Sequence, residues 1–329
     1  MADEANAAPD RQTSDGVEAL VRLGERYLTW PELCRRSGVE HEVGDRLWRA
    51  LGFPDRPPDE PAFGDDDVRA LAIAAEGLDE LEPKQRAEAL DLLVREARAL
   101  GAYLSRISDV EVDALAELGR LGLRRRTISG AFEHGIERSD YGWLLLYALR
   151  RRLDEVLRRR ATNQPGEQTD LAVGFIDLVD FTSTSAALDV EEFGRLLNRF
   201  EAIAWDVVTE AGGQVVKLIG DEAMLVCPSA EQAASAALDV ITVCGHGNLP
   251  PARAGLAAGP LMARVGDYFG PAVNVASRLV DHADAGSVLV DATIRERLGD
   301  EAAAIPRSAG KRRLKGIGEI EVWRLEAAR

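Results

Sequence analysis

The sequence predicts two parts: an all-helical first half, and then an α+β domain in which helices pack on a sheet. Two observations lead to this fold class. Residues 15–160 keep apolar residues three and four positions apart, as in ALDLLVREARALGAYL, which is the periodicity of amphipathic helices. Beyond residue 171, short apolar stretches typical of strands alternate with helical stretches, a mixture that is typical of layered domains.

The first half begins with a polar, acidic stretch, residues 1–14, which we expect to be a disordered tail. It lacks the basic and then apolar order of a signal peptide. Residues 15–160 form the predicted helical domain. Its last helix is expected from about residue 139 to 160 and finishes in a series of arginines, which suits the negative end of a helix dipole.

A polar stretch that contains Pro165 and Gly166, residues 161–170, is predicted to link the helical half to a second domain, residues 171–329. The strands expected there are LAVGFIDLVDF, GQVVKLIGDEAMLVC, RAGLAAGPLMAR and SVLVDA, and the helices are VEEFGRLLNRFEAIAWDVVTEAG and SAEQAASAALDVITVC. A Gly-Asp pair interrupts the second of these strand segments, which indicates a hairpin.

Composition narrows the classes of function. The 329 residues carry a formal charge of −16 at pH 7, which argues against general affinity for nucleic acid or anionic membranes, because such binding needs Lys and Arg. The three cysteines lack a CxxC pattern and indicate neither a disulfide framework nor a zinc site. No run approaches the roughly 20 apolar residues of a membrane span. We expect a cytoplasmic protein.

Two carboxylates are candidates for metal binding. Asp177 lies within an apolar run, where an unpaired carboxylate would be expensive to bury, so it needs a compensating charge. Asp221 follows a glycine at the expected hairpin tip. Carboxylates on adjoining strand ends can hold divalent ions together with substrate phosphates, although Asp is also a common turn former. The TSTS segment after Phe181 could receive a phosphate at a helix start, or could simply cap that helix.

Three segments, FIDLVDFT, VVKLIGDEAM and GDYFGPAVNVASR, resemble the signature segments of class III nucleotidyl cyclases, specifically the catalytic domain of adenylyl cyclases. The resemblance covers nearly all of residues 171–329 and implies a ferredoxin-like antiparallel sheet flanked by helices. The helical first half resembles the autoinhibitory regulatory domain of actinobacterial soluble members, some of which respond to pH. The family's activity converts ATP to 3′,5′-cyclic AMP and pyrophosphate with two divalent cations per site, Mg²⁺ or Mn²⁺.

The resemblance assigns roles to single residues. Asp177 and Asp221 match the metal-binding aspartates, whose ions would activate the ribose 3′-hydroxyl and neutralise the departing pyrophosphate. Lys217 and Asp267 match the adenine-selecting pair, in which the lysine donates to ring N1 and the aspartate accepts from the 6-amino group. These four residues would therefore define both the chemistry and the choice of base.

Further matches complete the implied site. Asn274 would orient the ribose, Arg278 would stabilise charge on the transferring phosphoryl group, and Lys315 would anchor the terminal phosphates. Phe181 and Thr182, in the first signature segment, are grouped with the substrate-binding residues. In this family the metal aspartates come from one protomer and the other matched groups from its partner, which implies a head-to-tail homodimer with two equivalent sites.

One position departs from the family pattern, since Asp180 stands where many members have glycine. An additional carboxylate there would alter the preference for metal ions or point into solvent. The departure concerns the tuning of the site more than its activity.

Other functions stay open. The chain could be a catalytically silent nucleotide-binding sensor, or a DNA-binding regulator with a cyclase-like domain. The second idea comes from residues 28–53, which resemble the helix-turn-helix of MerR-type regulators, although the second helix has more acidic residues than arginines. The regulatory input is a proton or a lipid in these expectations, and His134 is the candidate for a response to pH.

Overall fold

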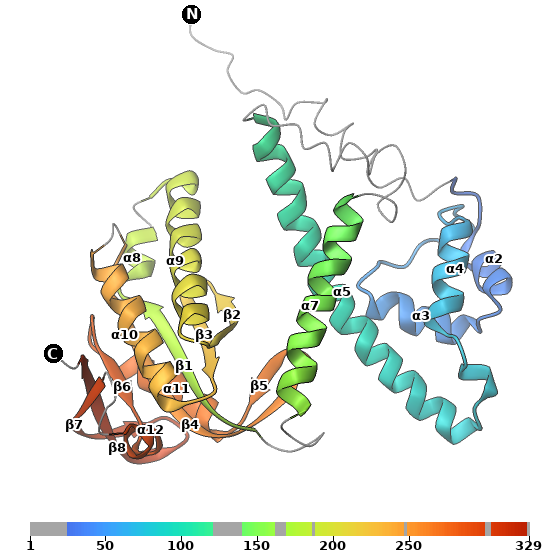
Figure 1. Cartoon of the computed structure of the whole chain (residues 1–329). Helices are drawn as coiled ribbons and strands as arrows, with labels where there is room; N and C mark the ends of the chain where they lie inside the picture. The colour runs from blue at the N-terminus through green and yellow to red at the C-terminus, as the bar shows by residue number, and fades with distance from the viewer. Residues whose placement is uncertain are drawn as a thin grey trace, which may run out of the picture. The chain divides into compact units, whose positions relative to one another are not determined.

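The computed structural model describes residues 25–120, 140–161, 169–185, 188–246, 249–299 and 304–327. The chain divides into two compact units, residues 1–158 and 159–329 (Figure 1). The described part of the first unit is helical apart from one isolated bridge between Leu28 and Phe63, and the second unit combines a sheet with helices. The predicted fold class, a helical region followed by an α+β domain, is confirmed.

The helices of the first unit are α2 (Trp30–Ser37), α3 (His41–Ala50), α4 (Asp65–Ala74), α5 (Pro83–Arg120) and α7 (Asp140–Ala161), with a 3₁₀ turn, η1 (Leu78–Glu80). Helix α2 begins after Thr29, whose backbone N–H donates to Oε2 of Glu32 at 2.9 Å, and Pro31 lies in its first turn. It ends at Gly38, whose φ of 75° is the left-handed conformation that glycine adopts readily.

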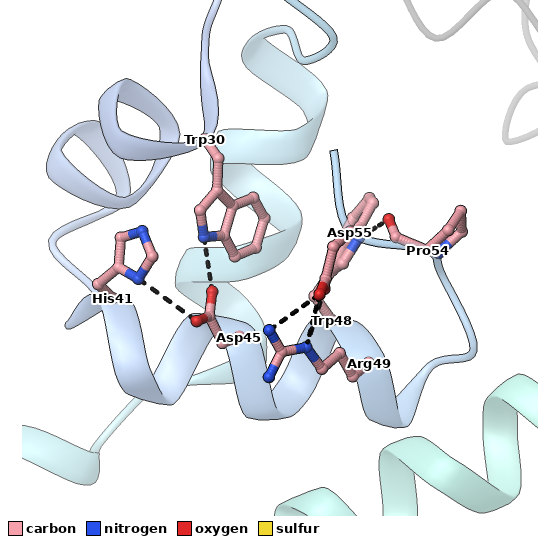
Figure 2. A network of polar contacts seen from close by, with 7 residues as sticks. All are labelled: Trp30, His41, Asp45, Trp48, Arg49, Pro54 and Asp55. Carbon is pink, nitrogen blue, oxygen red and sulfur yellow. Dashed lines mark hydrogen bonds and ion pairs between the residues drawn. The ribbon is translucent and has the colours of Figure 1, made fainter. Parts of the chain in front are cut away.

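A polar contact holds α2 against α3 (Figure 2). The indole Nε1 of Trp30 donates to Oδ1 of Asp45 at 2.7 Å, and Nδ1 of His41 lies 3.4 Å from Oδ2 of the same carboxylate. The rings of Trp30, Trp48 and Phe63 pack together with centroids 5.3–5.5 Å apart. Because a buried indole N–H needs an acceptor, Asp45 helps to fix how the two helices meet over this aromatic core.

The second unit is built on one sheet whose strands are β1 (Thr169–Leu178), β2 (Gln214–Ile219), β3 (Glu222–Cys227), β4 (Ala252–Arg264), β5 (Asp267–Phe269), β6 (Val288–Val290), β7 (Ala304–Leu314) and β8 (Gly318–Ala327). The strand order is β2-β3-β1-β4-β6-β8-β7, and β5 pairs with β4 beside this path. All pairings are antiparallel except that of β4 with β6. The predicted hairpin is confirmed as β2 and β3, whereas β5, β7 and β8 escaped the sequence pattern.

Helices cover both faces of this sheet. They are α8 (Phe181–Ser185), α9 (Val190–Glu210), α10 (Ala230–His246), α11 (Pro271–His282) and α12 (Ala292–Arg297). On β1, Ala172 and Ile176 pack in the cluster that contains α9 and α10, whereas Val173 and Phe175 pack in the cluster that contains α11. Because side chains alternate along a strand, Asp177 lies on the α11 face.

Helix α11 approaches β4 closely at Gly255. A Cβ atom at this position would lie 2.3 Å from the backbone N of Val280 and 2.5 Å from the carbonyl oxygen of Ala276. These are backbone atoms that cannot turn aside, so only glycine allows the helix to pack so near the strand. The contact fixes the height of α11 above the sheet, and with it the position of the residues that α11 exposes.

Candidate functional site

The two predicted metal aspartates lie at adjoining strand ends. Asp177 is the next-to-last residue of β1, and Asp221 is at the tip of the hairpin between β2 and β3, as predicted. The register places Asp177 opposite Glu222, and the N–H of Leu178 donates to the carbonyl of Asp221 at 3.3 Å. Residues that are far apart in the sequence therefore meet at one end of the sheet.

The compensating charge that Asp177 requires comes from Arg253. The two residues lie opposite each other where β1 pairs with β4. Nε and Nη2 of Arg253 donate to Oδ2 of Asp177 at 2.9 and 2.7 Å. The Asp177 side chain is 17% exposed and that of Arg253 is 26% exposed. Because the pair is largely shielded from water, its charge-assisted hydrogen bonds are stronger than those of an exposed ion pair.

The surroundings of Asp177 carry further negative charge. Burial raises the pKa of Asp221, and the charge of Asp177 together with a hydrogen bond to its side chain also raises it. Burial raises the pKa of Glu222 to about 7, and the negative charges of Asp177, Asp281 and Asp221 contribute to that rise. Burial and the repulsion between these carboxylates therefore raise both pKa values, and the charge of Arg253 offsets the rise only in part.

This donor set fits a divalent ion whose coordination a substrate completes. Mg²⁺ is usually held by one or two carboxylates together with substrate phosphates. Within the described ranges, no group of three or more His, Cys, Asp or Glu side chains is arranged to hold an ion unaided. Asp177 and Asp221 are close enough to repel each other, and a bound cation would relieve that repulsion. The pair therefore suits the ions that the resemblance implies.

The predicted base-selecting residues are joined directly. Nζ of Lys217, on β2, donates to Oδ2 of Asp267, on β5, at 2.5 Å, and the two side chains are 34% and 28% exposed. Oδ1 of Asp267 accepts from the backbone N–H of Tyr268 at 2.8 Å. Lys217 pairs with Met224, which packs in the α11 cluster, so Lys217 faces the same side of the sheet as Asp177. A cation and an anion that are 50 residues apart in the sequence thus form one ion pair.

The strand that carries Asp267 follows a tight turn. Arg264 pairs with Asp267 across the hairpin, and the turn residues Val265 and Gly266 have φ angles of 52° and 74°. Two successive positive φ angles are the mark of a type I′ turn, which suits the twist of paired strands. Glycine adopts such angles freely, but a β-branched residue does so rarely. The backbone at Val265 is therefore strained, two residues before the carboxylate of Asp267.

Helix α11 carries the predicted ribose and phosphate residues. Asn274 and Arg278 are one helical turn apart and both are exposed. Nη1 of Arg278 lies 3.8 Å from Oδ2 of Asp281 on the same helix. The buried positions of α11, by contrast, are alanines and aliphatic residues that face the sheet. Both polar side chains are therefore at the surface of the unit.

The segment after Asp177 forms a left-handed turn and the short helix α8. Asp180 is exposed with a φ of 57°. Glycine adopts this angle without strain and Asp tolerates it better than most residues, so the conformation fits the glycine that the resemblance implies at this position. Phe181 is 9% exposed, and its ring packs against Phe193 with centroids 5.6 Å apart. Thr182 lies in α8, but its side chain is outside the described part.

Of the remaining predictions, one concerns a residue in a surface turn and the others concern residues that the structure does not describe. Lys315 is exposed in the turn between β7 and β8. His134, the predicted disordered tail and all but the ends of the predicted linker lie outside the described residues. Across the ranges that are described, no helix is both long and apolar enough to cross a membrane.

Helices α2 and α3 form a helix-turn-helix, but both arginines of the second helix are engaged. Nη2 of Arg46 donates to Oδ1 of Asp91 at 2.6 Å. Arg49 donates to Asp55 through Nε at 2.8 Å and Nη2 at 2.9 Å (Figure 2). Because phosphate binding needs cations that are not already neutralised, the DNA-binding alternative gains no support from this surface.

Sequence reasoning missed Arg253, Glu222 and Asp281 as neighbours of the two predicted metal aspartates. A signal for Arg253 exists, because an arginine at the start of the apolar run RAGLAAG needs a partner as much as Asp177 does. The identity of that partner follows only from the pairing of β1 with β4.

Comparisons with known proteins agree with the motifs. The family model for the adenylate and guanylate cyclase catalytic domain matches residues 164–327. An adenylate cyclase of Streptomyces coelicolor is 35% identical over 298 residues, covering 86% of this chain and 74% of that protein. A pH-sensitive adenylate cyclase of Mycobacterium tuberculosis is 32% identical over 328 residues, covering 93% and 80%. The solved catalytic core of a rhodopsin-guanylyl cyclase with converted specificity, in complex with ATPαS, aligns with a TM-score of 0.46 and 24% identity, covering 50% of this chain and 98% of that one.

Proposed function

This chain belongs to the class III adenylate and guanylate cyclase family, and we propose that it is an adenylate cyclase that converts ATP to 3′,5′-cyclic AMP and pyrophosphate. The observation that carries the choice of ATP is the contact between Lys217 and Asp267. The observation that supports phosphoryl chemistry is the meeting of Asp177, near the end of β1, with Asp221, in the turn between β2 and β3.

The Lys217–Asp267 pair complements adenine. An ammonium donor and a carboxylate acceptor side by side suit ring N1, which accepts, and the 6-amino group, which donates. Guanine presents a carbonyl oxygen at C6 and an N–H at N1, so it would set like groups against each other at both positions. Buried polar groups that stay unpaired are expensive, and a site built on them rejects the wrong base strongly.

The reaction needs attack of the ribose 3′ oxygen on the α-phosphorus while the bond to pyrophosphate breaks. Asp177 and Asp221 would hold two divalent ions, Mg²⁺ or Mn²⁺, which when bound lower the pKa of the 3′-hydroxyl and neutralise the departing pyrophosphate. Asp177 is fit for this role because Arg253 engages only its Oδ2 atom in the hydrogen bonds described above.

The partner-directed groups lie on α11 and on the β7–β8 turn. Asn274 would orient the ribose, Arg278 would stabilise charge on the transferring phosphoryl group, and Lys315 would hold the terminal phosphates. All three side chains are exposed, so they are available to a second copy of the chain. In the head-to-tail homodimer each chain completes the site of the other, and a monomer is inactive.

The surface of α7 supports self-association. Trp143 and Leu146 are 64% and 58% exposed, and exposed apolar residues extend around the circumference of the first half of α7, up to Leu149, whereas its second half is rich in arginine. A helix that is apolar all round is normally buried. We infer that a second copy covers it, and sedimentation of the full chain would show a dimer.

The helical first unit is the proposed regulatory domain. A relative that matches 93% of this chain is a pH-sensitive adenylate cyclase, which supports a proton as the input, with a lipid as the other candidate. Substitution of His134 by alanine is the direct test. An activity profile that keeps its shape between pH 5 and pH 8 would remove this histidine as the sensor.

Product formation from ATP, GTP, CTP and UTP tests the proposed activity. Full-length chain is assayed with Mn²⁺ or Mg²⁺, and Asp177→Asn and Asp221→Asn serve as inactive controls. We expect cyclic AMP from ATP and little product from the other nucleotides. No cyclic product from any nucleotide, given by a folded dimer, would overturn the proposal and favour the silent nucleotide-binding sensor.

A further inference from the structure

Arg253 is the cation bonded to the acidic end of the sheet. It donates twice to Oδ2 of Asp177, and its Nη1 lies 3.4 Å from the backbone carbonyl of Asp281, at the end of α11. Only about a quarter of the Arg253 side chain is exposed, at 26%. Its position is fixed by the pairing of β4 with β1, in which Arg253 is directly opposite Asp177.

The charges that face Arg253 are predominantly negative. Asp177, Asp221 and Glu222, here called the carboxylate cluster, come from β1 and the β2–β3 hairpin. The carboxylate of Asp281 adds a further negative charge from α11, where Arg278 is its ion-pair partner. One guanidinium is therefore set against several carboxylates.

We propose that Arg253 is a positioning residue that holds Asp177 through Oδ2 and serves as the counter-charge of the carboxylate cluster until divalent ions bind. The inference rests on the proposed function, because it concerns the same metal aspartates. Two donors on a single oxygen restrict rotation of the carboxylate, which presents Oδ1 in a defined direction. Arg253 itself touches neither substrate nor reacting atoms in this account.

Removal of Arg253 should tighten metal binding but slow turnover. A guanidinium beside the cluster repels an arriving divalent cation, so its removal should tighten metal binding. The same removal leaves the carboxylates uncompensated in the metal-free chain, which lowers its stability. It also frees Asp177 to rotate, and misplaced ligands slow the reaction. Tighter metal binding with slower turnover is a pattern that general damage to the fold does not produce.

The experiment compares full-length Arg253→Met and Arg253→Lys with the wild-type chain. The matched control is Arg297→Met, because Arg297 donates to Asp170 at 3.0 Å, a carboxylate at the other end of β1. Melting temperature is measured against Mn²⁺ concentration, with α,β-methylene-ATP present as a ligand that cannot be cyclised. Cyclic AMP production is measured separately on the same proteins.

For Arg253→Met we expect a lower melting temperature without Mn²⁺, a half-saturating Mn²⁺ concentration at least about threefold lower, and kcat at least about tenfold lower. Arg253→Lys keeps the charge and should keep the wild-type half-saturation. Arg297→Met should match the wild type in its half-saturating Mn²⁺ concentration and in kcat. An unchanged or higher half-saturating concentration in folded Arg253→Met overturns the proposal.

If Arg253→Met does not fold, Arg253→Gln, which removes the charge but keeps an N–H donor, carries the same expectation and the same refutation. The thermal titration also separates this inference from the proposed function. A wild-type chain that forms no cyclic product, while Arg253→Met still binds Mn²⁺ more tightly than the wild type, would refute the cyclase activity and leave the role of Arg253 supported.

Discussion

Replacement of Asp267 by asparagine should weaken the preference for ATP over GTP. The carboxylate holds Lys217 at 2.5 Å through Oδ2 and accepts from the N–H of Tyr268 through Oδ1. Asparagine keeps the size of the side chain but loses the charge and exchanges one acceptor for an NH₂ donor. Adenine then loses the acceptor for its 6-amino group, and the carbonyl oxygen of guanine gains a donor.

The size of the effect follows from the kind of bond that is lost. The Asp267 side chain is 28% exposed, so its hydrogen bonds are partly shielded from water. A hydrogen bond to a charged group contributes about 1.5–3 kcal/mol, which corresponds to about a 10- to 150-fold change in the ratio of kcat/KM for ATP to that for GTP. The ratio separates base selection from any loss of stability, because both nucleotides are measured on the same folded protein.

The assay measures cyclic AMP and cyclic GMP from each nucleotide alone and from equimolar mixtures. The matched control is Asp284→Asn, because Asp284 is an exposed carboxylate that accepts from Arg324 at 2.6 Å and changes by the same charge. We expect the control to keep the wild-type ratio. An ATP-to-GTP ratio in folded Asp267→Asn within about twofold of wild type would refute base selection by this pair.

Three further predictions concern the backbone around the site and the buried cysteines. Gly255→Ala should remove most cyclase activity, because its Cβ would displace α11 and the residues it carries; activity at the wild-type level would contradict the close contact. Asp180→Ala should lower the free energy of unfolding by about 1 kcal/mol whereas Asp180→Gly should not, because the residue adopts a φ of 57°; equal urea midpoints would contradict this. Burial raises the pKa of Cys227 to about 12 and the pKa values of Cys34 and Cys244 to about 11. At pH 8 a disulfide reagent should therefore label none of the three thiols in the folded chain and all three after denaturation. Because these pKa values are raised on folding, their contribution to stability is complete below the ordinary thiol pKa of about 8.5 and is lost as pH rises from there toward 11, which unfolding curves at pH 8 and 10 would show.

Much of the second unit could be predicted because its sequence signals are local. The apolar run before Asp177, and the Gly-Asp pair between two apolar runs, each determine a strand end or a turn within a few residues. Strand β7 was not predicted because Pro306, Gly310 and three successive basic residues interrupt its apolar positions. Strand β8 does alternate charged and apolar residues, which is the pattern of a half-buried strand, and the prediction overlooked it. The role of Arg253 was not predicted for a different reason. Its partner, Asp177, lies 76 residues away in the sequence, and only the strand order brings the two together.

Two residues beside the candidate site adopt backbone angles that their residue types disfavour. Among the described residues, Asp180 and Val265 are the non-glycine residues with positive φ. Asp180 lies three residues after Asp177, a proposed metal ligand, and Val265 lies two residues before Asp267, which belongs to the proposed base-selecting pair. Strained backbone persists where surrounding structure over-determines it, and it is found most often at functional sites. The paired strands β1, β3 and β4 on one side, and β4 with β5 on the other, supply that surrounding structure. Independently of the motifs, the strain therefore lies in the two turns beside the carboxylates that we propose to bind metal ions and to select the base.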